Sequence, residues 1–247
     1  MKNNKLNSCW DHAISKLNLI QSNKDEVKLL KKLSSTDKPI VLGFLNAHGF
    51  NSLLDTPLFF DSIQCMDVIL RDGVGVEILL RMLSKDAGKN MNGTDLIPAL
   101  LEKYRGKRIA VLATKDPYLS ETRAILEKNM TIEVVVAEDG FHSDEHYLSI
   151  LTDKPVDIIL LGMGMPKQER VACMLKAELE YPTVIVCGGA IVDFLAGRFS
   201  RAPKWMRKIG MEWLYRFLLE PRRLFKRYIY GNAVFIFRST LYAFINH

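Results

Sequence analysis

The chain has 247 residues, enough for one large domain or one domain with a small appendage, and its 48% hydrophobic and 25% charged residues exclude a disordered, collagenous or mucin-like protein. No stretch is apolar enough, for long enough, to predict a membrane span. The net charge of +6 is concentrated between residues 198 and 227, where ten Lys and Arg stand against two Glu and leave −2 for the rest, so we expect a localised polyanionic partner: nucleic acid, an anionic membrane or a phosphorylated substrate.

The first 38 residues are polar and irregular, with weak helical signals near residues 10–20 and 24–33, and they lack the unbroken apolar run of a cleaved signal peptide. From residue 40 onward, short apolar runs typical of buried strands alternate with longer helical stretches. We predict strands at residues 40–45, 67–70, 108–113, 132–137, 157–161 and 183–187, and helices at 76–83, 95–103, 117–128, 144–151 and 167–179. This alternation predicts an α/β fold, a Rossmann-like, mostly parallel sheet with helices on both faces.

The pattern changes near residue 198, where the strand-like runs end and aromatic, aliphatic and basic residues mix at helical spacing. We therefore divide the chain into an α/β catalytic domain, residues 1–197, and a basic helical appendage, residues 198–247. Its last helix is amphipathic: one predicted face carries Tyr230, Val234, Phe237, Leu241, Phe244 and Ile245, and the other carries Asn232, Ser239 and Asn246. It is predicted to lie on a membrane surface, and packing on its own domain or on a second subunit is the alternative.

Glycines and acids follow several predicted strands, at the sheet edge where ligands gather. Asp72 follows the second strand in the segment DGVG and is either a functional carboxylate or the N-cap of the next helix. The segment GMGMPKQE, residues 162–169, enters a helix whose amides attract phosphate, yet it has neither the third glycine of a dinucleotide fingerprint nor the GKS/T of a P-loop. Together with Gly188-Gly189 and Gly93-Thr94-Asp95, it favours one phosphate-bearing ligand over separate turns.

His142 and His146 are four residues apart and share one predicted helix face, with Glu145 beside them. A metal site needs a third ligand, and neither an HExxH motif nor a nearby cysteine supplies one, so no metal is predicted.

The four cysteines lie far apart without a CxxC pair. Their spacing suggests neither a zinc ribbon nor a small disulfide scaffold, and it favours the reduced cytosol.

Residues 187–228, CGGAIVDFLAGRFSRAPKWMRKIGMEWLYRFLLEPRRLFKRY, closely resemble the signature end of the WecG/TagA/CpsF glycosyltransferases. The segments DGVGV, NGTDL and GMGMPKQE resemble the other blocks of that family, in the same order. The resemblance covers about residues 40–228, and the RAPKW, EWLYR and EPRR blocks are its most specific part.

This resemblance implies an inverting hexosyltransferase of cell-envelope polysaccharide biosynthesis. Such an enzyme moves N-acetylmannosamine, its uronic acid or glucose from a UDP donor to an undecaprenyl-diphosphate-linked sugar. It also implies a peripheral location on the cytoplasmic face of the cell membrane, with no metal or other cofactor, since the UDP-sugar is a substrate. By analogy, Asp72 corresponds to the catalytic aspartate of the family. Self-association through the amphipathic helix stays open.

The chemistry of inverting transfer agrees with these assignments, because it needs one carboxylate as general base and donors that stabilise the departing diphosphate. Asp72 is the expected base. The expected donor-binding residues are Asn46, Thr94, Asp95, Gly162, Gly164, Lys167, Gln168, Glu169, Gly188, Gly189 and Asp193. The expected acceptor or diphosphate ligands are Arg201, Arg216, Arg223, Lys226 and Arg227, whose cations would replace a metal.

Two departures from the family pattern concern the substrate contacts. Phe44 stands where many relatives have a threonine, two residues before Asn46, which removes one polar contact and leaves the transferred sugar open. Lys226 stands at a position often occupied by arginine, and a lysine cannot make a bidentate contact. The alternatives are a basic nucleic-acid-binding protein, which the lack of a known nucleic-acid module disfavours, and an inactive scaffold of a polysaccharide assembly complex.

Overall fold

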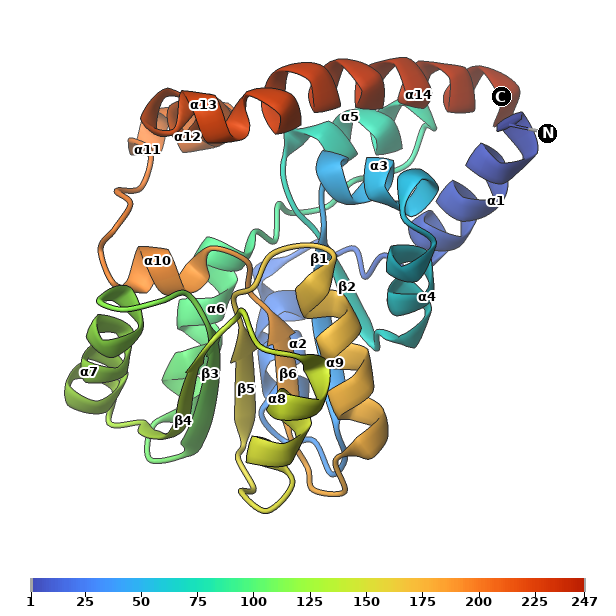
Figure 1. Cartoon of the computed structure of the whole chain (residues 1–247). Helices are drawn as coiled ribbons and strands as arrows, with labels where there is room; N and C mark the ends of the chain where they lie inside the picture. The colour runs from blue at the N-terminus through green and yellow to red at the C-terminus, as the bar shows by residue number, and fades with distance from the viewer. Residues whose placement is uncertain (1, 247) are drawn as a thin grey trace.

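The computed structural model describes residues 2–246 and contains one six-stranded, all-parallel sheet in the order β2-β1-β6-β5-β3-β4 (Figure 1). The strands are β1 (Ile40–Leu45), β2 (Val68–Arg71), β3 (Arg108–Ala113), β4 (Glu133–Asp139), β5 (Ile158–Leu161) and β6 (Val184–Cys187). All six predicted strands are confirmed within one or two residues, and so is the Rossmann-like α/β class.

Alternate residues of each strand pack into two separate hydrophobic cores, one on each face of the sheet. In β1, for example, Val41 and Leu45 join one core, whereas Leu42 and Phe44 join the other. A strand buried on both faces reads as a continuous apolar run, because both of its faces are covered by helices. This explains why the short apolar runs were sufficient to locate the strands.

Helices cover both faces of the sheet, as predicted (Figure 1). One core is closed by α2 (Asn23–Leu33), α6 (Gly93–Leu101), the short 3-10 helix η1 (Glu102–Tyr104), α7 (Tyr118–Met130) and α10 (Ile191–Leu195). The other is closed by α1 (Lys2–Ser15), α3 (Ala47–Asp55), α4 (Pro57–Cys65), α5 (Val74–Met82), α8 (Asp144–Leu151), α9 (Lys167–Glu178) and the C-terminal α14 (Gly231–Asn246).

The N-terminal segment is more ordered than predicted. The helix expected near residues 24–33 is confirmed as α2, whereas the one expected near residues 10–20 lies earlier, as α1. Residues 1–38 are therefore less irregular than predicted. Trp10 of α1 is fully buried, and its Nε1 donates a hydrogen bond of 3.1 Å to the carbonyl oxygen of Phe50. Its indole ring also lies 5.6 Å from the Phe235 ring of α14. Helix α1 therefore belongs to the core that holds the C-terminal helix.

The predicted boundary at residue 198 falls in the connection between α10 and α11 (Lys204–Lys208). Beyond it, α12 (Glu212–Leu219), α13 (Pro221–Phe225), the π-helical turn η2 (Lys226–Tyr230) and α14 run across the carboxyl end of the sheet (Figure 1). Helix α14 packs against α3 and α5. It is also tied to α3 by Asn51, whose Nδ2 donates to the Gly231 carbonyl oxygen at 2.8 Å, and by an Arg238–Asp55 ion pair of 3.1 Å.

The buried and exposed faces of α14 differ from the two predicted faces. The face that carries Ser239 is buried, together with Phe235 and Tyr242. Phe237 and Phe244 of the predicted apolar face are 70% and 83% exposed. Ser239 tolerates burial because its hydroxyl donates to the Phe235 carbonyl oxygen at 2.8 Å. The helix thus packs on its own domain and still presents an apolar face outward. Across residues 2–246, no helix combines the length and apolarity needed to cross a bilayer.

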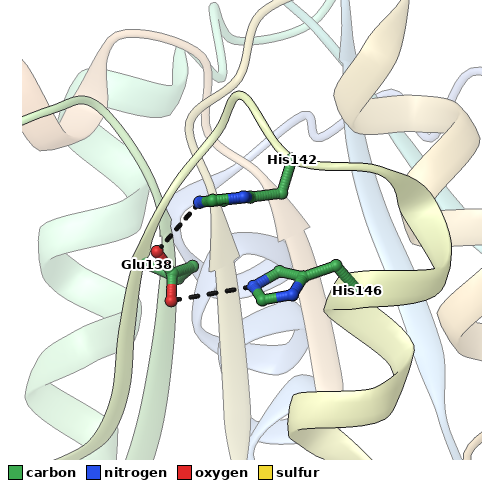
Figure 2. Close-up of side chains that lie close together, drawn as sticks. All are labelled: Glu138, His142 and His146. Atoms are coloured by element: carbon green, nitrogen blue, oxygen red, sulfur yellow. Dashed lines mark hydrogen bonds and ion pairs between the residues drawn. The ribbon is translucent and has the colours of Figure 1, made fainter.

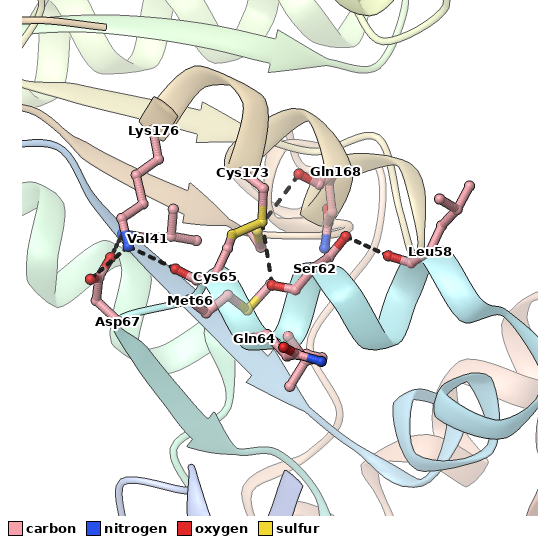
Figure 3. Close-up of a disulfide and its surroundings, with 12 residues drawn as sticks. Val41, Leu58, Ser62, Gln64, Cys65, Met66, Asp67, Gln168, Cys173 and Lys176 are labelled. Atoms are coloured by element: carbon pink, nitrogen blue, oxygen red, sulfur yellow. Dashed lines mark hydrogen bonds and ion pairs between the residues drawn. A yellow bond between two sulfur atoms is a disulfide. The ribbon is translucent and has the colours of Figure 1, made fainter. Parts of the chain in front are cut away.

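A disulfide joins Cys65, at the end of α4, to Cys173 in α9 (Figure 3). Lys176, one turn further along α9, donates to the Cys65 carbonyl oxygen at 2.7 Å and pairs with Asp67 at 2.8 Å. The cysteine spacing carried no sign of this bond, because the two residues are 108 positions apart and meet only in the fold. The pairing weakens the cysteine argument for a reduced compartment.

Candidate active site

A cleft of about 570 Å³ lies between the carboxyl ends of the strands and the C-terminal helices. Its floor comes from the segments that follow β1, β2, β5 and β6, and its roof comes from α12 to α14. Twelve of the predicted site residues line it: Asn46, Asp72, Thr94, Gly162, Gly164, Gln168, Gly188, Gly189, Asp193, Arg216, Arg223 and Arg227. The strand-end motifs and the basic segment therefore meet in one place.

Asp72 stands at the centre of this floor, directly after β2. Its backbone N–H donates to the Leu45 carbonyl oxygen at 3.0 Å, so the end of β1 holds its position. Asn46, the N-cap of α3, accepts from the Gly49 N–H at 3.1 Å and directs its Nδ2 to the Asp72 carboxylate at 3.4 Å. Helix α5 is capped by Gly73 with no side-chain hydrogen bond. The alternative that Asp72 is the N-cap is wrong, and its carboxylate is left to face the cleft.

Enclosure by the cleft walls raises the pKa of Asp72, because burial disfavours its charged form. The Asn46 hydrogen bond and the charges of Arg227 and Arg216 act in the opposite direction. The balance leaves a carboxyl group that holds a proton more readily than an exposed aspartate does.

Arg71, the residue before Asp72, anchors the strand end from below. Its guanidinium is 2% exposed and donates to the carbonyl oxygens of Ala87 at 2.9 Å, Gly88 at 2.8 Å and Gly73 at 3.1 Å. It also pairs with Glu77 at 3.3 Å. Sequence reasoning missed this residue, although an arginine at the end of an apolar strand is itself a signal, because a buried charge needs several partners. Arg71 positions the loop that carries Asp72.

Gln168 joins the two glycine loops that follow β5 and β6. Its Oε1 accepts from the N–H groups of Gly164 at 3.3 Å and Gly189 at 3.0 Å. The N–H groups of Gly162 and Gly188 donate to strand carbonyl oxygens at 2.8 Å and 2.7 Å. All four glycine amides expected to bind phosphate are thus occupied within the protein. Gly162 has another role here, since a Cβ on this residue would lie 2.6 Å from the Ala113 side chain.

The roof of the cleft supplies the positive charge that the sequence predicted. Arg216 lies over the Phe194 ring at 4.9 Å, and Arg223 pairs with Glu220. Arg227 stacks near Tyr228 at 5.5 Å, and its buried Nε has no hydrogen-bond partner. A buried guanidinium nitrogen without an acceptor is costly unless an anion reaches it. The arrangement provides donors for a diphosphate opposite Asp72.

Comparison with known protein families identifies the family of the chain. The model of the glycosyl transferase WecG/TagA/CpsF family matches residues 14–246. The chain belongs to this family. It is therefore a glycosyltransferase, in a family that serves cell-surface polysaccharide synthesis. The match extends past the expected residues 40–228: it begins at residue 14, near the end of α1, takes in α2 and reaches the end of α14.

Five predicted site residues of this glycosyltransferase lie outside the cleft lining. Lys167 donates to the carbonyl oxygens of Gly140 at 2.9 Å and His142 at 2.7 Å, and Lys226 is exposed. Asp95 and Arg201 form an ion pair of 2.9 Å, and Arg201 also pairs with Glu212 at 3.0 Å, so both hold the appendage to the body. Glu169 is buried beneath the glycine loops.

His48 is a cleft residue that sequence reasoning missed. It lies two residues after Asn46 in the first turn of α3. Burial lowers the pKa of His48 to about 4, assisted by the charge of Arg227 and opposed by Asp55. A neutral imidazole in a transferase cleft can donate or accept one hydrogen bond without adding charge. The sequence signal for His48 was its position, two residues after an Asn that directly follows a predicted strand.

Further cleft residues come from the appendage and include Glu212, Trp213, Tyr228 and Asn232. The rings of Trp213 and Tyr228 pack edge to face at 6.1 Å. Within residues 2–246, no group of three metal-ligating side chains lies in the lining of the cleft, and the one such group found lies at the β4–α8 connection.

Proposed function

We propose that this glycosyltransferase moves a hexose-type sugar from a UDP donor, with inversion, to an undecaprenyl-diphosphate-linked saccharide, and that Asp72 is the general base. The observation that carries the proposal is the position of the Asp72 carboxyl group, inside the cleft and under the electrostatic influence of Arg216 and Arg227. N-acetylmannosamine, its uronic acid and glucose are the donor sugars to test first.

In the proposed step, the Asp72 carboxylate takes the proton of an acceptor hydroxyl group as the acceptor oxygen attacks the anomeric carbon. The bond from that carbon to the donor phosphate breaks, and UDP leaves with the electron pair. The guanidinium groups of Arg216, Arg223 and Arg227 stabilise the charge that develops on the diphosphate. The raised pKa of Asp72 supports this role, since a base works best when its pKa lies nearer the operating pH.

The outer surface of the appendage supports a location at an anionic membrane. Large apolar side chains are exposed along it, namely Leu218, Phe225, Tyr230, Phe237 and Phe244. Exposed basic residues, including Arg222 and Lys226, lie between them in the chain. Apolar side chains among cations suit the boundary between anionic headgroups and acyl chains. This surface would hold the cleft close to a lipid-linked acceptor on the inner face of the membrane.

The transfer chemistry is tested by incubating the purified chain with a panel of UDP-sugars and polyprenyl-diphosphate-GlcNAc, with UDP release and the mass of the lipid product as readouts. We expect one donor to be used. D72N should lower kcat by about 10² to 10⁴, the usual range for loss of a general base. The control D153N changes an exposed aspartate in the same way and should keep full activity. Full activity in D72N would remove Asp72 from the mechanism.

Membrane binding is tested by flotation with vesicles that contain phosphatidylglycerol. The double variant F237E/F244E places two carboxylates on the exposed face of α14 and should lose most of the bound fraction. The control V27E changes another exposed apolar residue, on α2. If the double variant floats like the wild type, the membrane role of this face is refuted. A change from dimer to monomer in solution would assign the face to self-association instead.

A further inference from the structure

Three side chains with metal-ligand atoms converge at the connection between β4 and α8, outside the cleft. Glu138 points from β4 toward His142 in the loop and His146 in the first turn of α8 (Figure 2). The Glu138 Oε1 lies 3.1 Å from the His142 Nε2, and its Oε2 lies 3.7 Å from the His146 Nε2. All three ligand atoms lie within 4.8 Å of one another.

These separations are within about 0.2 Å of those around one tetrahedral ion. With bonds of about 2.0–2.2 Å, the ligands of a tetrahedral zinc lie roughly 3.3–3.6 Å apart. The two distances from Glu138 fall on either side of that range. Two imidazoles and one carboxylate are also a known ligand set for zinc with one position left open. The three side chains are 35% to 41% exposed, so a water molecule from the solvent can reach that position.

A second observation points to a missing partner. The Nε2 of His146 is buried and has no hydrogen-bond partner, although it faces the carboxylate. The His142 and His146 rings lie 4.4 Å apart, and only the His142 Nε2 is within hydrogen-bond distance of the Glu138 carboxylate. A buried ring nitrogen without a partner is unfavourable, and a metal ion placed between the three groups would satisfy it.

The surrounding structure holds the ligands in place without a metal. The Tyr147 hydroxyl accepts from the His142 N–H at 2.9 Å and donates to the Asp139 carbonyl oxygen at 3.0 Å. Ser143 caps α8. Lys167, the first residue of α9, donates hydrogen bonds to the loop at the Gly140 and His142 carbonyl oxygens. A site on such a preformed loop loses little conformational entropy when it binds an ion.

We propose that Glu138, His142 and His146 bind a divalent transition metal ion of the zinc type. The ion fastens β4 to α8 and, through Lys167, braces the glycine loop on one side of the cleft. It takes no part in the transfer chemistry. The sequence prediction lacked a third ligand because Glu138 belongs to the preceding strand and reaches the histidines only after the chain turns at Gly140.

The test is a calorimetric titration of the untagged, EDTA-treated full chain with ZnCl2. We expect one ion per chain and a rise in melting temperature of about 5–10 °C at one hundred times Kd. E138Q and H146Q should each weaken binding at least about tenfold, the low end for loss of even a supporting group of a metal ligand. E145Q changes an exposed carboxylate of the same helix and should bind like the wild type.

Co²⁺ gives an independent reading, since a tetrahedral site produces visible d–d absorption that E138Q should abolish. No saturable binding by the wild type, equal affinity in E138Q, or equal weakening in E145Q would each overturn the proposal. E138Q keeps a group that can hydrogen-bond His142, so its circular dichroism spectrum should match the wild type. If H146Q fails to fold, the affinity of E138Q for the metal is sufficient by itself to test the proposed site.

Discussion

Replacement of Glu169 by glutamine should make the protein more stable at alkaline pH. Glu169 is 1% exposed in the first turn of α9, beneath the two glycine loops. One carboxylate oxygen accepts from the Gln168 Nε2 at 2.8 Å, and the other has no partner. Burial raises the pKa of Glu169 from 4.5 to about 7, opposed by the Gln168 hydrogen bond and the charge of Arg227.

The raised pKa of Glu169 makes the free energy of unfolding depend on pH. A raised native pKa means that the folded protein resists ionisation of Glu169, whereas the unfolded chain ionises freely above its ordinary value. The contribution to stability is therefore greatest below pH 4.5, falls as the pH rises from 4.5 to about 7, and then levels off. With 1.36 kcal/mol for each pKa unit, the total loss is roughly 3 kcal/mol.

The assay is urea unfolding of E169Q and the wild type at pH 8 and pH 4.5. At pH 8 the variant should be more stable by about 3 kcal/mol, equivalent to a rise in Tm of about 6–12 °C. At pH 4.5 the two proteins should nearly coincide. E180Q, which changes an exposed glutamate just beyond the same helix, should change stability by less than about 0.5 kcal/mol. An E169Q protein no more stable than the wild type at pH 8 would refute the reasoning.

Two more predictions concern the C-terminal helices. R227K should lower kcat/KM by about tenfold or more, because lysine lacks the planar guanidinium fork, whereas R222K, an exposed change outside the cleft lining, should have no effect. Equal kinetics in both variants would count against Arg227 as a diphosphate ligand. F235A should cost about 3–5 kcal/mol in urea unfolding, since Phe235 is 1% exposed and packs on Trp10. F237A, at a 70% exposed site, should cost less than about 0.5 kcal/mol, and similar losses in both variants would contradict the assigned packing of α14.

The regular part of the fold was predictable because its signal is local. Five of the strands are buried on both faces, so each is visible as an apolar run of four to six consecutive residues. The edge strand β4 is only partly buried, but its run of three valines still marks it. Helices α3 and α4 were missed although Asn46 caps the first and Pro57 opens the second. Their burial depends on α1, α9 and α14, which come from distant parts of the chain. Residues that typically start helices were therefore present, but the apolar pattern that follows them was too weak to predict either helix.

The candidate site was predictable to the extent that its residues follow strands. Asp72, Asn46 and the glycine loops could be placed at one edge because parallel strands all end there. The occupied glycine amides could not be foreseen, because they depend on where Gln168 points after α9 packs. The faces of α14 were also misjudged, because the hydropathy pattern places Ser239 on an exposed face. In the structure Ser239 is buried, and its hydroxyl is hydrogen-bonded within the helix.

The amino-acid sequence by itself determined the six strands, the family and the carboxylate at the end of β2, because each of these depends on residues that are neighbours in the chain. Only the tertiary structure decided which cations face that carboxylate, that Cys65 meets Cys173, and that Glu138 reaches His142 and His146. These contacts join residues on different elements. Their geometry depends on how whole helices pack and how loops turn, which no short stretch of sequence specifies.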